Sequence, residues 1–460
     1  MIPAVDPLRP SFDRAQLRPG ILHLGPGAFF RAHLAVYTDA ALAAEGGDWG
    51  ILAAGLRSDD LARRYDAQQG LCTVLVRDST GTRAQVVGSI LGGVAPERIL
   101  SCMDYPGIRI VSLTLTEKAY GLHPGTGGLD PDHPAIAADL ADPLRPRSAV
   151  GLITAGLAAR HAAGIAPFTP LSCDNLPDNG QVLRRLVIEF ATRRDPALAD
   201  WIAEHVPFPS TMVDRIPPAS TETTLDDAAR LTGRPDALAV ETEPFSQWVI
   251  EDHFAQGRPD WSRGGALFVT RVAPYEKMKL RMLNGTHSLL AWLGLAAGHQ
   301  YIRDAISDPA IRAEARTHLA AAATTLDPVP GVDPADYADA LITRFDNRAI
   351  AHRLLQIATD SSQKLGPRIL ATAVDDLSRG GDADRMARAT AAWMLHASQL
   401  RPLSDPRAPE IEAALAVPPR SPGALVHALM TLPGLFPPLL RNNTAWQARV
   451  AAHVGQLSGD

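Results

Sequence analysis

Residues 274–288 carry three side chains that together could serve a proton transfer. These are the amine of Lys279, the amide of Asn284 and the imidazole of His287, set in an otherwise apolar stretch. At about 100° per residue, an α-helix would place Asn284 roughly 140° and His287 roughly 80° around the axis from Lys279, so all three could line one arc. The flanking apolar residues predict that this arc is buried, and a buried lysine loses its charge more readily than an exposed one. The pattern therefore predicts a lysine that can act as a base.

Simpler interpretations of the same residues remain open. A single lysine or histidine on a helix is more often a surface charge or a hydrogen-bonded filler than a catalytic group. Glu276, three residues before Lys279, could form an ordinary helical ion pair or pass protons between the lysine and water. The spacing does not choose between these two roles, but the three groups together favour chemistry.

The composition bounds the class of protein. The 460 residues predict two or three domains, and 46% hydrophobic with 20% charged residues is typical of a soluble globular chain. A formal net charge of −6 provides no broad basic surface, so we expect no nucleic-acid partner. Neither a signal peptide nor an apolar run of about 18 residues is evident, so we expect a cytoplasmic protein that does not enter a membrane.

The cysteines and histidines predict neither disulfides nor a metal centre. Three cysteines, widely separated and odd in number, are expected to be free thiols. The 14 histidines include no HExxH motif, and no compact group of His, Asp and Glu has convincing ligand spacing. We therefore expect no metal.

Strand and helix patterns alternate along the first half of the chain. Such alternation predicts an α/β fold with a mostly parallel sheet. From about residue 272 onward, long runs with helical periodicity replace the strand patterns, which predicts a mainly α-helical domain at residues 271–460 after an α/β domain at residues 1–270. The expected strands are 21–24, 49–56, 72–76, 84–91, 108–114 and 168–172, and the expected helices include 31–44, 149–163, 279–297, 311–326, 337–345 and 387–400.

The first expected strand runs into a glycine turn. Gly25 and Gly27 would let a backbone approach a pyrophosphate closely, and the helix start that follows would offer free N–H groups. The third glycine of a G-x-G-x-x-G pattern is absent, and Phe30 stands in its place, so a plain tight turn is an alternative. The pattern on its own is consistent with a dinucleotide site.

Charged residues after the second expected strand bear on the choice of dinucleotide. Asp59 or Asp60 could accept hydrogen bonds from an adenosine ribose, which favours NAD. Arg57 could instead bind a 2′-phosphate and favour NADP. The alternative is that Arg57, Asp59 and Asp60 belong to an exposed helix cap and contact no cofactor. Two further loops, residues 116–118 and 172–180, follow strands of the expected parallel sheet, where ligands gather, and are also site candidates.

Five sequence blocks, in order along the chain, resemble those of the polyol-specific long-chain dehydrogenases, the family of mannitol dehydrogenase and fructuronate reductase. The resemblance extends over nearly the whole chain and implies a Rossmann-type N-terminal domain with a mostly helical C-terminal domain. It also implies a metal-independent, nicotinamide-dependent interconversion of a secondary alcohol and a ketone. The blocks are GPGAFFRAH at 25–33, SCDNLPDNG at 172–180, FPSTMVDRIPPAS at 208–220, EPFSQWVIEDHFAQGRPDW at 243–261 and YEKMKLRMLNGTHS at 275–288.

The resemblance implies roles for particular residues. Lys279 would exchange the hydroxyl proton, Asn284 and Asn175 would donate hydrogen bonds to the reacting oxygen, and His287 would hold that oxygen or a neighbouring hydroxyl. Asp214 also matches a residue that lines the family's pocket, although a structural ion pair with Arg215 is an equal alternative. The expected cofactor contacts are Gly25, Gly27, Phe29, Asp59, Lys118 and Asp214.

Phe30 departs from the family pattern, because these enzymes commonly carry histidine at that position. We expect this change to alter packing near the pyrophosphate more than chemistry, since both glycines of the turn are present.

The substrate-binding residues suggested by the resemblance are Asn175, Lys364 and Gln356. The 116–120 loop looks like the fructuronate reductase version, and Gln356 stands where a mannitol dehydrogenase is expected to carry arginine. Lys118 or Lys364 could pair with a hexuronate carboxylate, so we expect D-fructuronate to be reduced to D-mannonate.

A polyol such as mannitol, arabinitol or sorbitol is the alternative substrate, and a monomer is the expected state. A nucleotide sensor would not need the intact lysine, asparagine and histidine, and a sugar isomerase would not need the dinucleotide turn.

Overall fold

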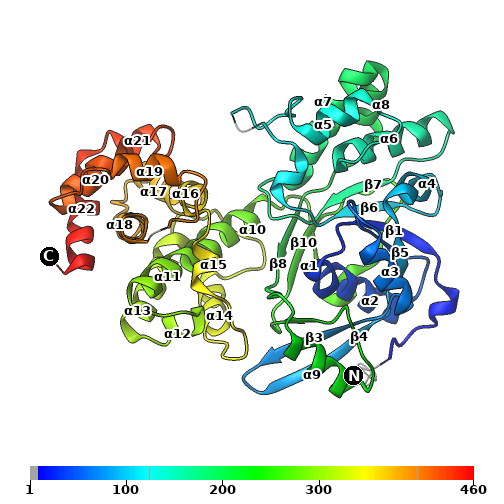
Figure 1. Ribbon diagram of the computed structural model, residues 1–460, viewed down its shortest axis with the longest axis horizontal. Coiled ribbons are helices and arrows are strands. Elements are labelled where there is room, and N and C mark those ends of the chain that lie inside the picture. The colour runs from blue at the N-terminus through cyan, green and yellow to red at the C-terminus, as the bar shows by residue number, and fades with distance from the viewer. Residues whose placement is uncertain (1–8, 124, 401, 460) are drawn as a thin grey trace. The chain divides into compact units, whose positions relative to one another are not determined.

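The computed structural model describes residues 9–123, 125–400 and 402–459, and it divides into two compact units, Met1–Ala273 and Pro274–Asp460 (Figure 1). The division falls close to the boundary after residue 270 that the change of periodicity suggested. Both units bury many apolar side chains.

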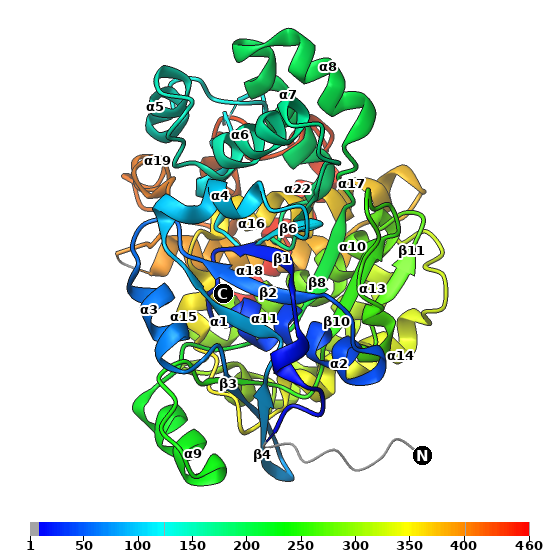
Figure 2. The ribbon, with the colours of Figure 1, turned by 90° about the vertical axis from the view of Figure 1, so that its right-hand side faces the viewer.

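A five-stranded parallel sheet forms the centre of the first unit, with strand order β5-β2-β1-β6-β7, so that β1 lies between β2 and β6 (Figure 2). The chain adds strands on one side of β1 and then on the other, which makes the carboxyl end of β1 a topological switch point. The strands are short, apolar and almost entirely buried because helices cover both faces. The expected parallel sheet is thus confirmed, with β1 (Pro19–Leu24), β2 (Gly50–Ala54), β5 (Ile90–Val94), β6 (Ile110–Leu113) and β7 (Thr169–Ser172).

The prediction of a single strand over residues 84–91 is wrong. The segment holds the end of β4 (Gly81–Val87) and the start of β5, which belong to different sheets. The chain is redirected at Gly88 and Ser89, where Gly88 N–H donates to the Asp39 carboxylate at 2.7 Å and Ser89 Oγ donates to Ala35 O at 2.8 Å. Hydrophobicity alone does not reveal this polar anchor.

The helix expected over residues 31–44 is two helices, α1 (Ala28–Ala32) and α2 (Leu34–Glu45). They are separated at His33, whose backbone has φ −125° and ψ −91°. The His33 ring stacks on Phe29 and meets the edge of Trp248, and its Nε2 lies 3.1 Å from Gln247 O. These contacts with a distant segment hold the break.

Two small sheets complete the first unit. In one, β3 (Cys72–Asp78) pairs antiparallel with β4 and parallel with β9 (Val240–Thr242). In the other, β10 (Gln247–Glu251) pairs with β8 (Thr211–Asp214) and β11 (Leu267–Val269). The remaining helices are η1 (Arg14–Gln16), α3 (Asp60–Ala67), η2 (Pro96–Arg98), α4 (Ile99–Met103), η3 (Glu117–Tyr120), α5 (Pro134–Ala141), α6 (Ala149–Ala162), α7 (Asn179–Arg194), α8 (Pro196–His205), α9 (Glu222–Thr232) and η4 (Trp261–Gly264).

The second unit is helical, as expected, and no strand occurs in it among the described residues. Helix α18 (Asp384–Gln399) runs through its centre, in contact with α11 (Gly285–Ala296), α13 (Pro309–Ala323) and α22 (Thr444–Ser458) (Figure 1). The other elements are α10 (Ala273–Met278), η5 (Lys279–Asn284), α12 (Ile302–Ala305), α14 (Pro334–Phe345), α15 (Leu354–Ala358), α16 (Ser361–Leu365), η6 (Gly366–Leu370), α17 (Ala371–Ser378), α19 (Ala408–Ala414), α20 (Pro422–Met430) and α21 (Pro438–Arg441).

None of the helices in the described residues has the length and apolarity needed to cross a membrane. The three cysteines, all within the described residues, are free thiols, as expected.

Candidate active site

The predicted lysine lies at the start of a π-helical turn. Element η5 runs from Lys279 to Asn284, and the N–H of Gly285 reaches back five residues to Leu280 O. In such a turn, residues five apart come into register, so Lys279 and Asn284 lie on the same side of the turn. The α-helical angles expected for this segment are therefore wrong, and the difference brings the amine and the amide closer in rotation. Widened turns of this kind occur frequently at functional sites.

The turn is buried, as its apolar neighbours predicted. Lys279 is 8% exposed and Asn284 is 9% exposed. Gly285 permits this burial, because a Cβ there would lie 3.2 Å from Arg368 O in the second π-helical element, η6. The guanidinium of Arg368 donates to Asn284 O at 3.3 Å and to Ser288 Oγ at 3.0 Å. The two π-helical turns thus hold each other in place.

Arg281, which lies between Lys279 and Asn284 in the turn, anchors the turn to other elements of the second unit. Arg281 donates to Thr325 Oγ1 at 2.8 Å and pairs with Asp375 at 2.6 Å, and Lys277 lies 3.3 Å from the same carboxylate. Partial burial raises the pKa of Asp375, but the bonds and charges of Arg281 and Lys277 lower it more, so its net pKa is below the ordinary value. Glu276, the proposed proton relay, is half-buried one turn before Lys279.

His287 follows on α11 and is neutral. Its ring stacks on Phe345, with centroids 5.6 Å apart, and meets the edge of His352 at 4.9 Å. Burial lowers the pKa of His287 well below its usual value, and the nearby His352, Arg368, Arg344 and Lys364 lower it further. A neutral imidazole offers one N–H donor and one acceptor nitrogen.

The proposed substrate residues Lys364 and Gln356 lie near one another in the chain's fold. The amine of Lys364, on α16, donates to Ile357 O at 3.0 Å and to Thr359 O, at the carboxyl end of α15. Gln356 lies on α15 itself and is exposed. The sequence did not indicate that the lysine also caps this helix.

The glycine turn combines a position that requires glycine with an open stretch of backbone. Gly25 has φ +84°, and a Cβ there would lie 2.4 Å from Thr114 O, so the position requires glycine. A Cβ on Gly27 would meet only Gly25 O, at 3.9 Å, so the backbone there faces open space. Phe30 is fully buried and stacks on His23 with centroids 3.9 Å apart, which explains how the turn forms without a third glycine.

The other expected cofactor residues are placed as follows. Phe29 is half-buried against His33, with ring centroids 4.8 Å apart. Asp59 precedes α3 after the carboxyl end of β2, and Arg63 pairs with both Asp59 and Asp60. Arg57 is exposed just before them.

A buried polar network at the carboxyl ends of β6, β7 and the start of β8 was missed by the sequence analysis. Tyr120 OH donates to Asp174 Oδ2 at 2.5 Å and lies 2.7 Å from Ser172 Oγ. Asn179 Nδ2 donates to Asp174 O, and the Asn179 side chain also exchanges hydrogen bonds with the backbone of Thr211, each at 2.9 Å. The hydroxyl and carboxylate types were visible in the sequence, but their pairing depends on the sheet.

This network holds the segment that carries Asn175. Asn175 directly follows Asp174 and is exposed, and Asp214, 3% exposed, ends the strand that Thr211 begins. The guanidinium of Arg215 donates to Ala32 O and Glu243 O. The side chain of Lys118 lies outside the described part of the structure. Asn175, Asp214 and the glycine turn belong to the first unit, whereas Lys279, Asn284 and His287 belong to the second.

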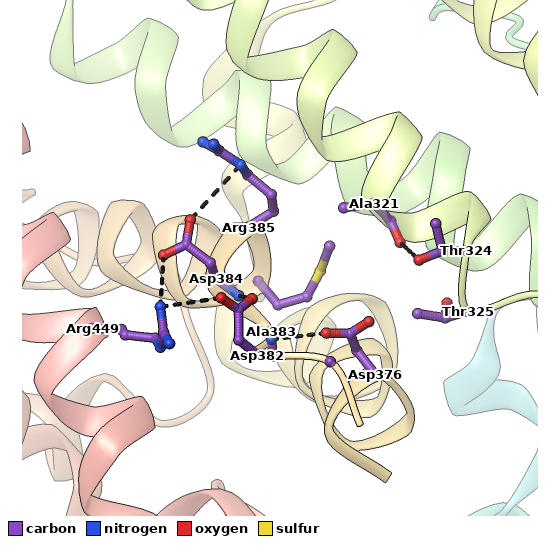
Figure 3. Close-up of a pocket in the computed structure, with 11 residues that line it drawn as sticks. Ala321, Thr324, Thr325, Asp376, Asp382, Ala383, Asp384, Arg385 and Arg449 are labelled. Carbon is purple, nitrogen blue, oxygen red and sulfur yellow. Dashed lines mark hydrogen bonds and ion pairs between the residues drawn. The ribbon is translucent and has the colours of Figure 1, made fainter. Parts of the chain in front are cut away.

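A separate pocket of about 660 Å³ lies in the second unit, and none of the predicted site residues lines it (Figure 3). Arg449 lies between Asp382 and Asp384, at 3.2 and 3.8 Å, and Asp376 accepts the N–H of Ala383 at 2.8 Å. Among the described residues, no group of three or more His, Cys, Asp or Glu side chains is arranged to hold a metal ion.

Comparison with known proteins agrees with this architecture. Over 98% of its length the chain is 42% identical to D-mannonate oxidoreductase of Escherichia coli, of which it covers 95%. It is 41% identical to mannitol 2-dehydrogenase of Cereibacter sphaeroides, over 84% of this chain and 82% of that one. Among solved structures, it is similar to Pseudomonas fluorescens mannitol 2-dehydrogenase in a ternary complex with NAD and D-mannitol, with a TM-score of 0.85, 36% identity and coverage of 98% and 94%.

Two family models match the chain in order. The mannitol dehydrogenase Rossmann domain matches residues 19–263, and the mannitol dehydrogenase C-terminal domain matches residues 271–457. The chain belongs to the mannitol dehydrogenase family of oxidoreductases.

Proposed function

We propose that the chain is an NAD(H)-dependent oxidoreductase that interconverts a secondary alcohol and a ketone of an open-chain sugar derivative, and that its reaction is the reduction of D-fructuronate to D-mannonate. The observation that carries this proposal is the buried Lys279 in register with Asn284 on a π-helical turn, one turn before the neutral His287. The relatives named D-mannonate oxidoreductase and mannitol 2-dehydrogenase support the same class of reaction.

The proposed chemistry is a proton transfer coupled to hydride transfer. When bound, the nicotinamide supplies a hydride to the carbonyl carbon in reduction. Lys279, as the ammonium, donates a proton to the carbonyl oxygen, while Asn284 and Asn175 donate hydrogen bonds to that oxygen as its negative charge develops. The amine that remains regains its proton from water through Glu276. One ketone, one NADH and one proton therefore give one alcohol and one NAD⁺.

We assign cofactor binding to the glycine turn and its neighbours. The open backbone at Gly27 and the conformation of Gly25 suit a pyrophosphate, and Asp59, which precedes α3 after the end of β2, is the proposed acceptor for ribose hydroxyls. Phe29, Lys118 and Asp214 complete the proposed set. Titration of protein fluorescence with NADH and NADPH tests the choice of cofactor, because the exposed Arg57 would favour NADPH if it bound a 2′-phosphate.

The hexuronate is preferred because cationic side chains lie near His287 in the second unit. Lys364 and Arg368 lie close enough to His287 to lower its pKa, and a carboxylate would be stabilised beside them. A polyol such as mannitol, arabinitol or sorbitol is the second candidate. A polyol is favoured by the hydrogen bonds that the amine of Lys364 donates to Ile357 O and Thr359 O. Because these carbonyls already serve as acceptors, the amine does not need a substrate carboxylate.

The test measures NADH oxidation at 340 nm with D-fructuronate, D-fructose and other ketoses. Lys279→Ala is expected to abolish turnover and to leave the NADH dissociation constant nearly unchanged. Lys277→Ala is the matched control, since Lys277 is two residues away and pairs with Asp327 and Asp375. Full turnover in Lys279→Ala refutes the assigned proton transfer, and a wild-type chain that oxidises no NADH with any of these ketones refutes the proposed function.

The proposed enzyme is a monomer that works in the cytoplasm. The family resemblance implies the monomer, and the three free thiols suit a reducing compartment. Light scattering on the purified chain, whose mass is 49.1 kDa, tests the first point, and a mass near twice that value contradicts it.

A further inference from the structure

A second histidine, His352, lies against His287 in the second unit. His352 precedes α15, and its ring meets the edge of His287 with centroids 4.9 Å apart and planes at 64°. Phe345, at the end of α14, also stacks on the His287 ring, at 5.6 Å and 22°. His287 therefore contacts one apolar ring and one polar ring.

Each of the two histidines has a buried ring nitrogen that lacks a hydrogen-bond partner. In His287 it is Nε2, and in His352 it is Nδ1. Buried polar atoms in native proteins are nearly always paired. Other buried side chains of this chain, such as His396, also carry an unpartnered nitrogen, but the rings of His287 and His352 touch, so one ligand can serve both. Both residues keep part of their surface exposed, and a half-turn of either ring exchanges its buried nitrogen with a ring carbon.

The backbone that carries His352 is fixed. Its carbonyl accepts the N–H of Ile302 at 3.0 Å, and two residues later the N–H of Leu354 donates to Gln300 O at 2.9 Å. A bridge between Tyr301 and Arg353 lies between these bonds. Because this backbone is fixed, only the side chain of His352 has to be ordered when a substrate binds.

The protonation state indicates which group the ring binds. Burial, followed by the charge of Lys364, lowers the pKa of His352 to about 4, so the ring is neutral near pH 7. A neutral imidazole has one donor and one acceptor, which matches a hydroxyl group, itself a donor and an acceptor. A carboxylate, which only accepts, would leave the lone pair of the ring unused.

We propose that His352 is a specificity-determining residue, which binds the substrate hydroxyl on the carbon next to the one that His287 serves. The two rings, with centroids 4.9 Å apart, are close enough to serve oxygens on neighbouring carbons of one substrate. This inference rests on the proposed function, and it requires a ketone that carries an adjacent hydroxyl.

The test uses the full chain with NADH and a pair of ketones, one with and one without the hydroxyl next to the carbonyl. His352→Phe keeps an aromatic ring against His287 and removes the nitrogens. It is expected to lower kcat/KM for the hydroxylated ketone about 10- to 100-fold and to leave the rate with the deoxy ketone within about twofold of wild type. His352→Asn, whose amide reaches the position of Nδ1, is expected to recover part of the loss, and His352→Gln is expected to recover less.

His396→Phe is the matched control, because His396 is buried on α18, has an unpartnered Nε2 and has a pKa lowered to about 4 by burial. It is expected to retain wild-type kcat/KM. Equal losses for both ketones in His352→Phe, or no loss for either, overturn the inference while the proposed function stands. A wild-type chain that reduces neither ketone overturns the proposed function and the inference together.

Discussion

Replacing Tyr120 by phenylalanine is expected to destabilise the first unit and to slow catalysis. The hydroxyl of Tyr120 is fully buried, and it donates to Asp174 at 2.5 Å and lies 2.7 Å from Ser172. Burial and the neighbouring Asp174 raise the pKa of Tyr120 well above its usual value, so the hydroxyl stays protonated and remains a donor. Phenylalanine keeps the ring, so the change removes only the hydroxyl and its contacts with Asp174 and Ser172.

The expected loss of stability depends on whether the acceptor of the lost hydrogen bond is charged. A hydrogen bond to a charged group contributes about 1.5–3 kcal/mol to stability, whereas one between neutral groups contributes about 0.5–1.5 kcal/mol. Asp174 is only 7% exposed, so water replaces the lost donor poorly and the upper half of the first range is expected. Tyr65→Phe is the matched control, because Tyr65 is equally buried and donates to a neutral acceptor, Pro26 O, at 3.1 Å.

Urea unfolding monitored with and without NADH provides the assay. Where the two compact units unfold in separate transitions, the transition that NADH shifts to higher urea belongs to the unit that binds it. Because Asn175 directly follows Asp174, Tyr120→Phe is also expected to lower kcat about tenfold or more. A loss of stability no larger than that of Tyr65→Phe, or a double-mutant cycle with Asp174→Asn that shows no coupling, refutes the reasoning.

Three further changes test other parts of the structure. Gly25→Ala places a Cβ 2.4 Å from Thr114 O, and the backbone angle of φ +84° by itself costs an alanine about 1–2 kcal/mol. NADH titration is therefore expected to show weakened binding, and wild-type affinity contradicts this. Gln356 is exposed, so Gln356→Arg is expected to change the free energy of unfolding by no more than about 0.5 kcal/mol. It is expected to lower the ratio of fructuronate to fructose turnover, and an unchanged ratio contradicts the substrate assignment. Burial lowers the pKa of His318 in the folded chain to about 4. As the pH falls below about 6.5, this histidine therefore binds a proton in the unfolded chain before it does so in the folded one, and up to about 3 kcal/mol of stability is lost between pH 6.5 and 4. Urea unfolding of His318→Phe should then depend less steeply on pH, and an identical slope to wild type refutes that assignment.

The periodicity of the sequence was sufficient for the arrangement of long elements. Strands of the parallel sheet, such as β1, are apolar runs bounded by glycine or polar residues, and helices such as α18 show a clear apolar face. The short strands β8, β9, β10 and β11 were missed, because three to five residues among prolines and charged residues give too short a pattern. Such strands exist because neighbours far away in the chain supply their hydrogen bonds.

The glycine turn shows which part of a site a sequence pattern can predict. Gly25 is favoured locally by its backbone angle, φ +84°, and is also required by the close approach of Thr114 O from the segment that follows β6. The acceptability of Phe30 depends on His23, which lies on β1 and is fixed there by hydrogen bonds with Ser112 at 2.9 Å and Thr114 at 2.8 Å. A missing glycine was therefore weak evidence against a dinucleotide, because a packed ring fills the space beneath the turn.

The register of Lys279 and Asn284 could not be obtained from spacing, because an α-helix and a π-helical turn fit the same residues. A π-helical turn is rare, so contacts from other elements must stabilise it. Arg281 supplies one such contact through Asp375, and Arg368 supplies another through Asn284 O. The proposed proton transfer therefore depends on two arginines whose guanidinium groups hold the shape of the helix that presents the lysine.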